Sequence, residues 1–222
     1  MIECKDEIFI WYLVGLITSD GSLSIDGRHV DITSKNKDFL ELVKRKLLIS
    51  NKVGEKHGGK RQESYRIQIS DRNFYKFLMS IGLFPGKSLI LEQVEVPHEY
   101  FNCFLRGIID GDGDIRRWIH PTNKREQWAL RITSGSKLFL QWLRKGINEN
   151  LRVDGKIHLQ KTQGRSLFKL KFGKIAAKII LSKCYFDSNV LGLYLRRKYL
   201  LAADCINSES KWSKSKTVFD SI

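Results

Sequence analysis

Residues 13–21 read LVGLITSDG, and residues 105–113 read LRGIIDGDG. Each stretch is an apolar run that ends in an Asp-Gly pair. Two further pairs of segments recur in the same order, ITS at 32–34 with ITS at 132–134, and YRIQI at 65–69 with FKLKF at 168–172. One match could arise by chance, but three matches in one order predict a duplicated structural unit.

Hydrophobic periodicity predicts the same elements in both units. In the first unit we expect helices at 6–19, 37–48 and 73–81, with strands at 22–26, 29–33, around Val53 and at 65–69. In the second we expect helices at 98–111, 136–149 and 174–184, strands at 114–120, 126–133, 156–161 and 166–172, and a closing helix at 190–204. Gly21 is expected to end the first helix as a C-cap.

The order of these elements predicts an α+β protein made of two pseudo-twofold-related αββαββα domains with antiparallel sheets. Residues 1–83 form the predicted first half, 84–97 the linker, 98–204 the second half and 205–222 a polar tail.

Alternation along the strands assigns their side chains to two faces. The predicted inward side chains are Leu23, Ile25, Val30, Ile32, Tyr65, Ile67, Ile69, Ile115, Ile119, Trp128, Leu130, Ile132, Ile157, Leu159, Phe168, Leu170 and Phe172. The opposite face is polar and basic, and a sheet face of this kind can read a DNA groove. The predicted DNA contacts on or beside it are Ser22, Ser24, Asp26, Arg28, Asp31, Thr33, Lys35, Arg66, Gln68, Asp114, Arg116, Trp118, Arg131, Lys156, His158, Gln160, Lys169 and Lys171. An ordinary solvated face is the alternative.

Charge points to a polyanionic partner. The 222 residues include 39 Lys and Arg against 24 Asp and Glu, a formal charge of +15. Nucleic acid is the partner we favour; an anionic membrane surface or simply solvated lysines are the alternatives. The 42% of apolar residues is enough for a sizeable core, which excludes disorder as the main state.

Other features of the sequence argue against a membrane-spanning, secreted, zinc-binding or disulfide-rich protein. No apolar run approaches the roughly 20 residues that span a bilayer, and the first residues do not resemble a secretory signal. The four cysteines are far apart in sequence, which argues against a zinc site or a disulfide framework. We therefore expect an intracellular protein with no membrane partner, made in a prokaryotic cytoplasm or an organelle matrix.

Small residues on the two motif helices predict a close helix pair. Gly15 and Ser19 share one helix face, as do Gly107 and Gly111, and small residues at this spacing let two backbones approach closely. If the helices pack side by side and parallel, Asp20 and Asp112 meet at their C-terminal ends. A plain C-cap turn is the alternative for each Asp-Gly pair.

Such a pair of acids is electrostatically unfavourable by itself. Each helix C-terminus adds roughly half a negative charge, and like charges at close range repel. A cation is therefore implied, and ligands that are all oxygen suit Mg²⁺ better than Zn²⁺. Carboxylates that hold divalent ions over a phosphodiester are the pattern of two-metal hydrolysis.

The doubled motif and the αββαββα repeat resemble the LAGLIDADG homing endonuclease family, over about residues 6–204. Two motifs in one chain resemble its monomeric branch, in which the sheets form a DNA-binding saddle. The resemblance implies a monomer that cuts both strands of a long asymmetric DNA target across the minor groove and leaves short 3′ overhangs. Mg²⁺ is the implied cofactor, with Mn²⁺ or Ca²⁺ able to replace it for binding.

The resemblance also assigns residues at the site. The eighth motif residues, Asp20 and Asp112, would bind metal, and the seventh, Ser19 and Gly111, would offer backbone carbonyls. Thr18 departs from the family's Asp at a position that is not a metal ligand.

The family places a basic residue near each scissile phosphate. Lys87 and Lys198 are therefore the candidates for polarising water or stabilising the phosphorane. Surface lysines are the alternative.

Two other functions are possible on the same fold. One is an intron RNA maturase, with host intron RNA as its partner, and the other is a DNA-binding protein that does not cleave. Because such proteins need neither acid, the retention of Asp20 and Asp112 favours the nuclease.

Overall fold

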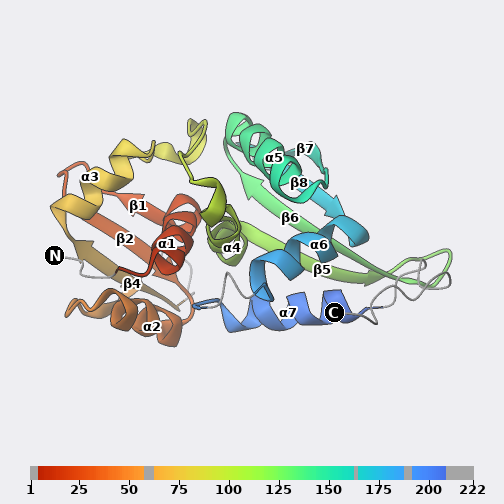
Figure 1. The fold of residues 1–222 in the computed structure, drawn as a ribbon, viewed down its shortest axis with the longest axis horizontal. Coiled ribbons are helices and arrows are strands. Elements are labelled where there is room, and N and C mark those ends of the chain that lie inside the picture. Colours follow the sequence, from red (N-terminus) through yellow and green to blue (C-terminus); the bar gives the residue numbers. More distant parts are fainter. Residues whose placement is uncertain (1–4, 58–62, 163–164, 188–191, 209–222) are drawn as a thin grey trace.

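The computed structural model describes residues 5–57, 63–162, 165–187 and 192–208. Two helices, α1 (Glu7–Asp20) and α4 (Phe101–Asp112), lie side by side at the centre, and a four-stranded antiparallel sheet flanks them on each side (Figure 1). This arrangement confirms the predicted α+β class with two αββαββα halves. Cys4, and residues 209–222 of the polar tail predicted at 205–222, lie outside the described residues; residues 205–207 belong to the last helix.

Both halves share one topology. The first contains β1 (Gly21–Leu23), β2 (His29–Ser34), α2 (Lys37–Leu47), β3 (Val53–His57), β4 (Glu63–Ser70) and α3 (Arg72–Ser80), in the sheet order β1-β2-β4-β3. The second contains β5 (Gly113–Ile119), β6 (Glu126–Ser134), α5 (Lys137–Leu151), β7 (Lys156–Thr162), β8 (Arg165–Gly173) and α6 (Lys174–Tyr185), in the order β5-β6-β8-β7. The short 3-10 turns η1 (Lys87–Leu89) and η2 (His98–Tyr100) lie between the halves, and α7 (Arg196–Asn207) follows α6.

Side-chain caps explain where several helices begin. The carboxylate of Asp6 accepts a hydrogen bond from the Phe9 amide at 3.1 Å, and Asn36 caps α2 in the same way at 3.0 Å. Asp71 and Ser136 cap α3 and α5. A cap of this kind satisfies amides that the first helical turn leaves without an internal partner.

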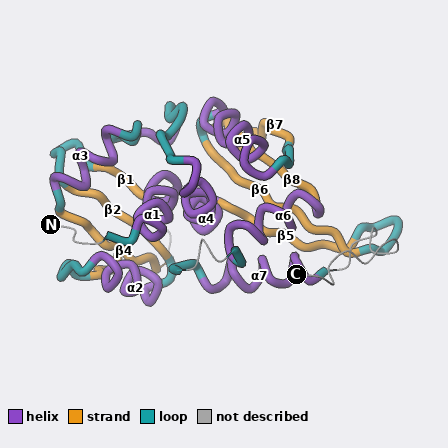
Figure 2. The backbone as a smooth tube through the Cα atoms, viewed as in Figure 1, coloured by secondary structure: helices purple, strands orange, loops and turns teal. Residues whose placement is uncertain are grey.

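The helices cover one face of each sheet, so the core lies between the sheets and the helix layer (Figure 2). Most of the predicted inward side chains are buried or partly buried there. Three are not: Ile25 is 95% exposed, and Ile119 and Leu159 are each 54% exposed. Strand β1 ends at Leu23, so Ile25 lies in the turn after it. Ile119 is the last residue of β5, and Leu159 lies in the middle of β7, the edge strand of its sheet.

Gly21 ends α1 as predicted: it is the C-cap residue, and its amide donates to the carbonyl of Ile17. Its backbone is extended, with φ −98°, and leads directly into β1. Glycine is needed there because a Cβ would lie 2.6 Å from the Cα of Ile17. The closing helix begins at Arg196, not at residue 190; Gly192, with φ +148°, and the residues up to Leu195 precede it in non-helical conformation.

Within the described ranges, no helix is both long enough and apolar enough to cross a membrane.

Candidate active site and DNA-binding face

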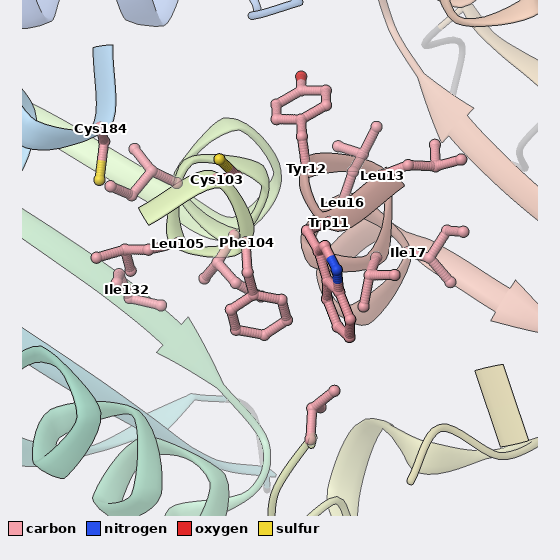
Figure 3. Packing of buried hydrophobic residues seen from close by; sticks show 14 of the residues in the cluster. Trp11, Tyr12, Leu13, Leu16, Ile17, Cys103, Phe104, Leu105, Ile132 and Cys184 are labelled. Atoms are coloured by element: carbon pink, nitrogen blue, oxygen red, sulfur yellow. The ribbon is translucent and has the colours of Figure 1, made fainter. Parts of the chain in front are cut away.

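The site is built on the contact between α1 and α4. A Cβ at Gly107 would lie 2.6 Å from the amide nitrogen of Leu16, and a Cβ at Gly15 would lie 2.9 Å from the carbonyl carbon of Phe104. The two backbones are therefore in direct contact, which only glycine permits. Figure 3 views the pair end-on, with Leu13 and Ile17 directed to the first half and Leu105 to the second.

The contact continues to the last helical turn, where the motif acids lie. Gly111 faces Ser19, and a Cβ at residue 111 would lie 3.2 Å from a carboxylate oxygen of Asp20. The Ser19 hydroxyl donates back to the carbonyl of Leu16 at 3.1 Å, which keeps it within its own helix. Asp20 and Asp112 therefore stand together at adjoining helix ends.

The electrostatics of the two acids fit this placement. Both carboxyl groups remain accessible to solvent, but the surrounding elements displace part of their water. This desolvation raises the pKa of Asp20, and desolvation together with the negative charge of Asp20 raises the pKa of Asp112 to about 6. The nearby ammonium groups of Lys87 and Lys198 act in the opposite direction on both pKa values.

Lys87 reaches the acids from the segment that joins the halves. Gly86 adopts φ +76°, with open space around its missing Cβ, so glycine serves the backbone turn that starts η1. The Lys87 side chain is only 3% exposed, and its ammonium donates to the carbonyl of Gly21 at 2.6 Å. Burial lowers the pKa of Lys87 to about 8, although Asp112 and Asp20 raise it.

Lys198 has the corresponding position in the second half. It lies in the first turn of α7, is 4% exposed, and donates to the carbonyl of Gly113. Burial lowers its pKa, followed in size by the like charge of Arg197. Each lysine thus contacts the residue that directly follows a motif acid, although the two lysines come from unrelated segments.

The donor set around the acids consists of oxygen atoms. The Gly21 amide donates to the carbonyl of Ile17, and the Gly113 amide donates to that of Ile109. These are the last backbone hydrogen bonds of α1 and α4. The following carbonyls, including those of Ser19 and Gly111, belong to the open C-terminal turns. In the part of the chain that the structure describes, no cluster of three His, Cys, Asp or Glu could hold a metal. Two carboxylates with nearby carbonyls suit Mg²⁺ or Ca²⁺, provided that water or substrate oxygens complete the shell.

The predicted DNA contacts divide into two groups by position. Strand register places most of them on the face of the sheets that turns away from the helices: Ser22, Asp31, Thr33, Arg66, Gln68, Asp114, Arg116, Trp118, Arg131, Lys156, His158, Gln160, Lys169 and Lys171. We call this set the outer face; its side chains are exposed or half-buried. Ser24, Asp26, Arg28 and Lys35 lie instead in the turns beside it.

Asp26 differs from its predicted position in a strand. Its carboxylate accepts hydrogen bonds from the amides of Arg28 and His29, each at 3.1 Å, and also contacts the His29 ring. The contact with His29, largest among its causes, lowers the pKa of Asp26 to about 2. Asp26 therefore orders the β1–β2 turn.

Side chains of the outer face pair with one another. Asp31 accepts a hydrogen bond from Gln68 at 3.1 Å and lies 3.6 Å from the Arg66 guanidinium. In the second half Arg131 pairs with Asp114, Lys169 donates to Gln160 at 2.6 Å, and the Lys171 ammonium lies over the Trp118 ring. Exposed pairs of this kind are each worth only about 0.2–1 kcal/mol, so they order the side chains without locking them.

Two features of the site were not predicted. Asp31 joins the predicted base readers Arg66 and Gln68, which strand register alone reveals. Asp110, which occupies in the second motif the position of Thr18 in the first, is buried and accepts hydrogen bonds from the hydroxyls of Tyr12 and Tyr185. The available signal was a charged residue in the mostly apolar motif helix.

Comparisons with known proteins agree with this architecture. Residues 8–82 match the family model of the LAGLIDADG-like domain. No curated protein matches the chain in sequence. The solved structure of I-DmoI in complex with DNA and Ca is 19% identical, with 88% of this chain and 97% of that chain covered and a TM-score of 0.58.

Two other solved structures show the same fold. I-WcaI bound to its DNA recognition sequence is 13% identical over 86% of this chain and 85% of that chain, with a TM-score of 0.59. Full-length DUF199/WhiA from Thermatoga maritima is 16% identical over 89% of this chain, with a TM-score of 0.53, and the match spans 60% of that chain. Residues 8–82 are therefore similar to the LAGLIDADG-like domain, and most of the chain shares the two-domain fold of I-DmoI and I-WcaI.

Proposed function

We propose that the protein is a site-specific DNA endonuclease that depends on a divalent metal and cuts both strands of one duplex. The observation that carries the proposal is the doubled arrangement of one acid and one buried lysine at the paired helix ends. Asp20 and Asp112 stand together, while Lys87 and Lys198 donate to the carbonyls of Gly21 and Gly113.

This arrangement opposes stability, which argues for a chemical use. Burying an ammonium group is costly, and bringing two carboxylates together is also unfavourable. A protein that only binds DNA needs neither feature, whereas phosphodiester hydrolysis needs both signs of charge at one place. A divalent ion at the acids would polarise the phosphodiester and lower the pKa of the attacking water.

In this proposal the acids bind metal and the lysines stabilise the reacting phosphate. Asp20 and Asp112 hold the ion or ions, with the carbonyls of Ser19 and Gly111 as further oxygen ligands. Lys87 and Lys198 stabilise the negative charge that develops on the phosphate. The Ca that accompanies DNA in the I-DmoI structure is consistent with a divalent ion here.

The outer face supplies DNA binding. Lys and Arg outnumber Asp on it, and the chain carries a charge of +15, so it can neutralise many phosphates. Arg66 and Gln68 are two residues apart on β4 and point the same way, as readers of adjacent bases would. A saddle of two such sheets fits a monomer on a long asymmetric target.

A non-cleaving DNA-binding protein is the second candidate. One observation favours it: the described residues hold only two carboxylates at the helix ends, so any metal site must be completed by other oxygens. A maturase that binds intron RNA remains a prediction.

The experiment is cleavage of a randomised duplex DNA library with Mg²⁺, followed by sequencing of the cut ends. The endonuclease proposal expects one recurring sequence, cut on both strands with short 3′ overhangs. Library members that are bound and enriched but never cut, with either Mg²⁺ or Mn²⁺, would support the non-cleaving alternative. Preferential retention of structured RNA over DNA would support the maturase.

A further inference from the structure

A buried carboxylate accepts a hydrogen bond from the residue that precedes α7, the helix that carries Lys198. Helix α7 begins after Leu195, and no side chain of its own N-cap residue caps it. The side chain of Asp110 does so from α4, since its Oδ2 atom accepts a hydrogen bond from the Leu195 amide at 2.7 Å. The carbonyl of Leu195 in turn accepts from the amides of Lys198 at 2.8 Å and Tyr199 at 3.1 Å.

Asp110 is also tied to two other helices. The hydroxyl of Tyr12 on α1 donates to Oδ2 at 2.8 Å, and the hydroxyl of Tyr185 on α6 donates to Oδ1 at 2.5 Å. Asp110 is 4% exposed, and the guanidinium of Arg106 lies 5.0 Å from the centre of the Tyr12 ring. A carboxylate buried with three donors is held in one orientation, so it can fix the backbone that it caps.

In the described part of the first half, no buried carboxylate caps the segment of Lys87 in this way. Thr18 occupies the motif position that corresponds to Asp110, and its hydroxyl donates within α1, to the carbonyl of Val14 at 2.7 Å. The segment of Lys87 is held instead by Ser136, which donates to the carbonyl of Leu91 at 2.5 Å. The Leu91 amide donates in turn to the carbonyl of Lys87 at 2.8 Å.

We propose that Asp110 is a positioning residue for Lys198: by capping α7 it sets the helix at the depth from which the Lys198 ammonium reaches the Gly113 carbonyl beside Asp112. The inference rests on the proposed endonuclease function. Because Lys87 is held by other residues, loss of Asp110 affects one of the two lysines. The two strands of the target therefore respond differently, and a nicked duplex accumulates.

The test measures cutting of each strand separately, on a duplex labelled on one strand at a time. Lys198→Met first identifies the strand that depends on Lys198. Asp110→Ala is expected to slow that same strand by about 10²-fold, the usual effect of misplacing a catalytic group by roughly 1 Å, and to leave the other strand near the wild-type rate. Asp110→Asn, which keeps one acceptor oxygen, is expected to restore part of the lost rate.

Two further variants separate positioning from general damage. The double variant Asp110→Ala/Lys198→Met is expected to cut no more slowly than Lys198→Met, because both changes act through one group. Thr18→Val, which removes the corresponding hydroxyl in the first half, is expected to cut both strands at the wild-type ratio. Equal slowing of both strands by Asp110→Ala, or additive losses in the double variant, would overturn the inference.

A readout without cleavage covers the case in which the proposed function fails. Hydrogen exchange of the Leu195, Lys198 and Tyr199 amides is expected to speed up in Asp110→Ala and Asp110→Asn, while the amides of α6 stay protected. Unchanged protection at the start of α7 overturns the inference whether or not the protein cuts DNA. A third result is that the wild-type protein cuts no DNA while Asp110→Ala still exchanges these amides faster than the wild type does. That result would overturn the endonuclease proposal and the strand effect, and only the capping role would stand.

Discussion

Replacing Gly107 by Ala would test whether the close helix contact holds the site together. The new Cβ would overlap the carbonyl oxygen of Tyr12 and lie 2.6 Å from the amide nitrogen of Leu16. Both are backbone atoms, so no side chain can turn aside to make room. Since non-bonded carbon contacts are comfortable at about 3.5–4.0 Å, α1 and α4 would have to separate by roughly 1 Å.

The expected cost follows from two opposing effects. Overpacking a well-filled interface costs about 1–3 kcal/mol, and Ala is better than Gly inside a helix by about 0.5–1 kcal/mol. We expect a net loss of about 1–2 kcal/mol in the free energy of unfolding. For a chain of 222 residues, this lowers the thermal midpoint by about 2–8 °C. The separation should also move Asp20 away from Asp112 and reduce cleavage by about 10²-fold.

Thermal and urea unfolding measure the first effect, and cleavage of a cognate duplex measures the second. Gly54→Ala is the matched control, because Gly54 lies in β3 with nothing within 4 Å of its missing Cβ and has no left-handed backbone. The control should unfold at or slightly above the wild-type midpoint. If Gly107→Ala unfolds and cuts like the control, the contact between the helices does not position the acids and the reasoning is wrong.

Three further predictions follow from the charges on the molecule. DNA affinity should fall about 10³–10⁵-fold between roughly 50 and 200 mM salt if six to ten phosphates are neutralised, and a flat titration would contradict a DNA-binding outer face. Arg66→Ala should cost about 1–3 kcal/mol at one or two positions of one half-site, as measured by a specificity profile; uniform weakening at every position would make Arg66 a phosphate contact. Burial and the charge of Asp20 raise the pKa of Asp112 from 3.8 to about 6. The metal-free protein should therefore lose stability as the pH rises from about 4 through 6, because the folded state then holds an unfavourable negative charge at Asp112. Asp112→Asn should therefore raise the thermal midpoint in EDTA near neutral pH and not below about pH 4; an equal gain at both pH values would show that the effect is not electrostatic.

The fold was largely predictable because its signals are local and occur twice. The recurrence of the Asp-Gly motif and of the two strand segments placed the elements, and alternation identified core residues such as Ile32 and Ile132. The errors lie where tertiary context decides. Ile25 alternates correctly but follows a strand of only three residues, and the start of α7 depends on a cap supplied by Asp110 from another helix.

The site was predictable only as far as the motifs reach. Gly15 and Gly107 marked the helix contact, since a helical glycine with no turn to make suggests close packing. Lys87 and Lys198 were named through family resemblance, and nothing local in their segments indicates that each ammonium would reach a carbonyl next to an acid. The pairing of Asp31 with Arg66 and Gln68 depends on the register of β2 against β4, which the sequence pattern leaves open.

The most direct test of the account is the cutting of each strand of a selected target by wild-type protein, Asp20→Asn and Asp112→Asn. Each carboxylate is proposed to hold a metal ion, whereas DNA binding is assigned to the outer face. With Mg²⁺ the wild-type protein should cut both strands, and both variants should bind the target with near-wild-type affinity yet give no double-strand break. Double-strand cutting at the wild-type rate by either variant would contradict the account.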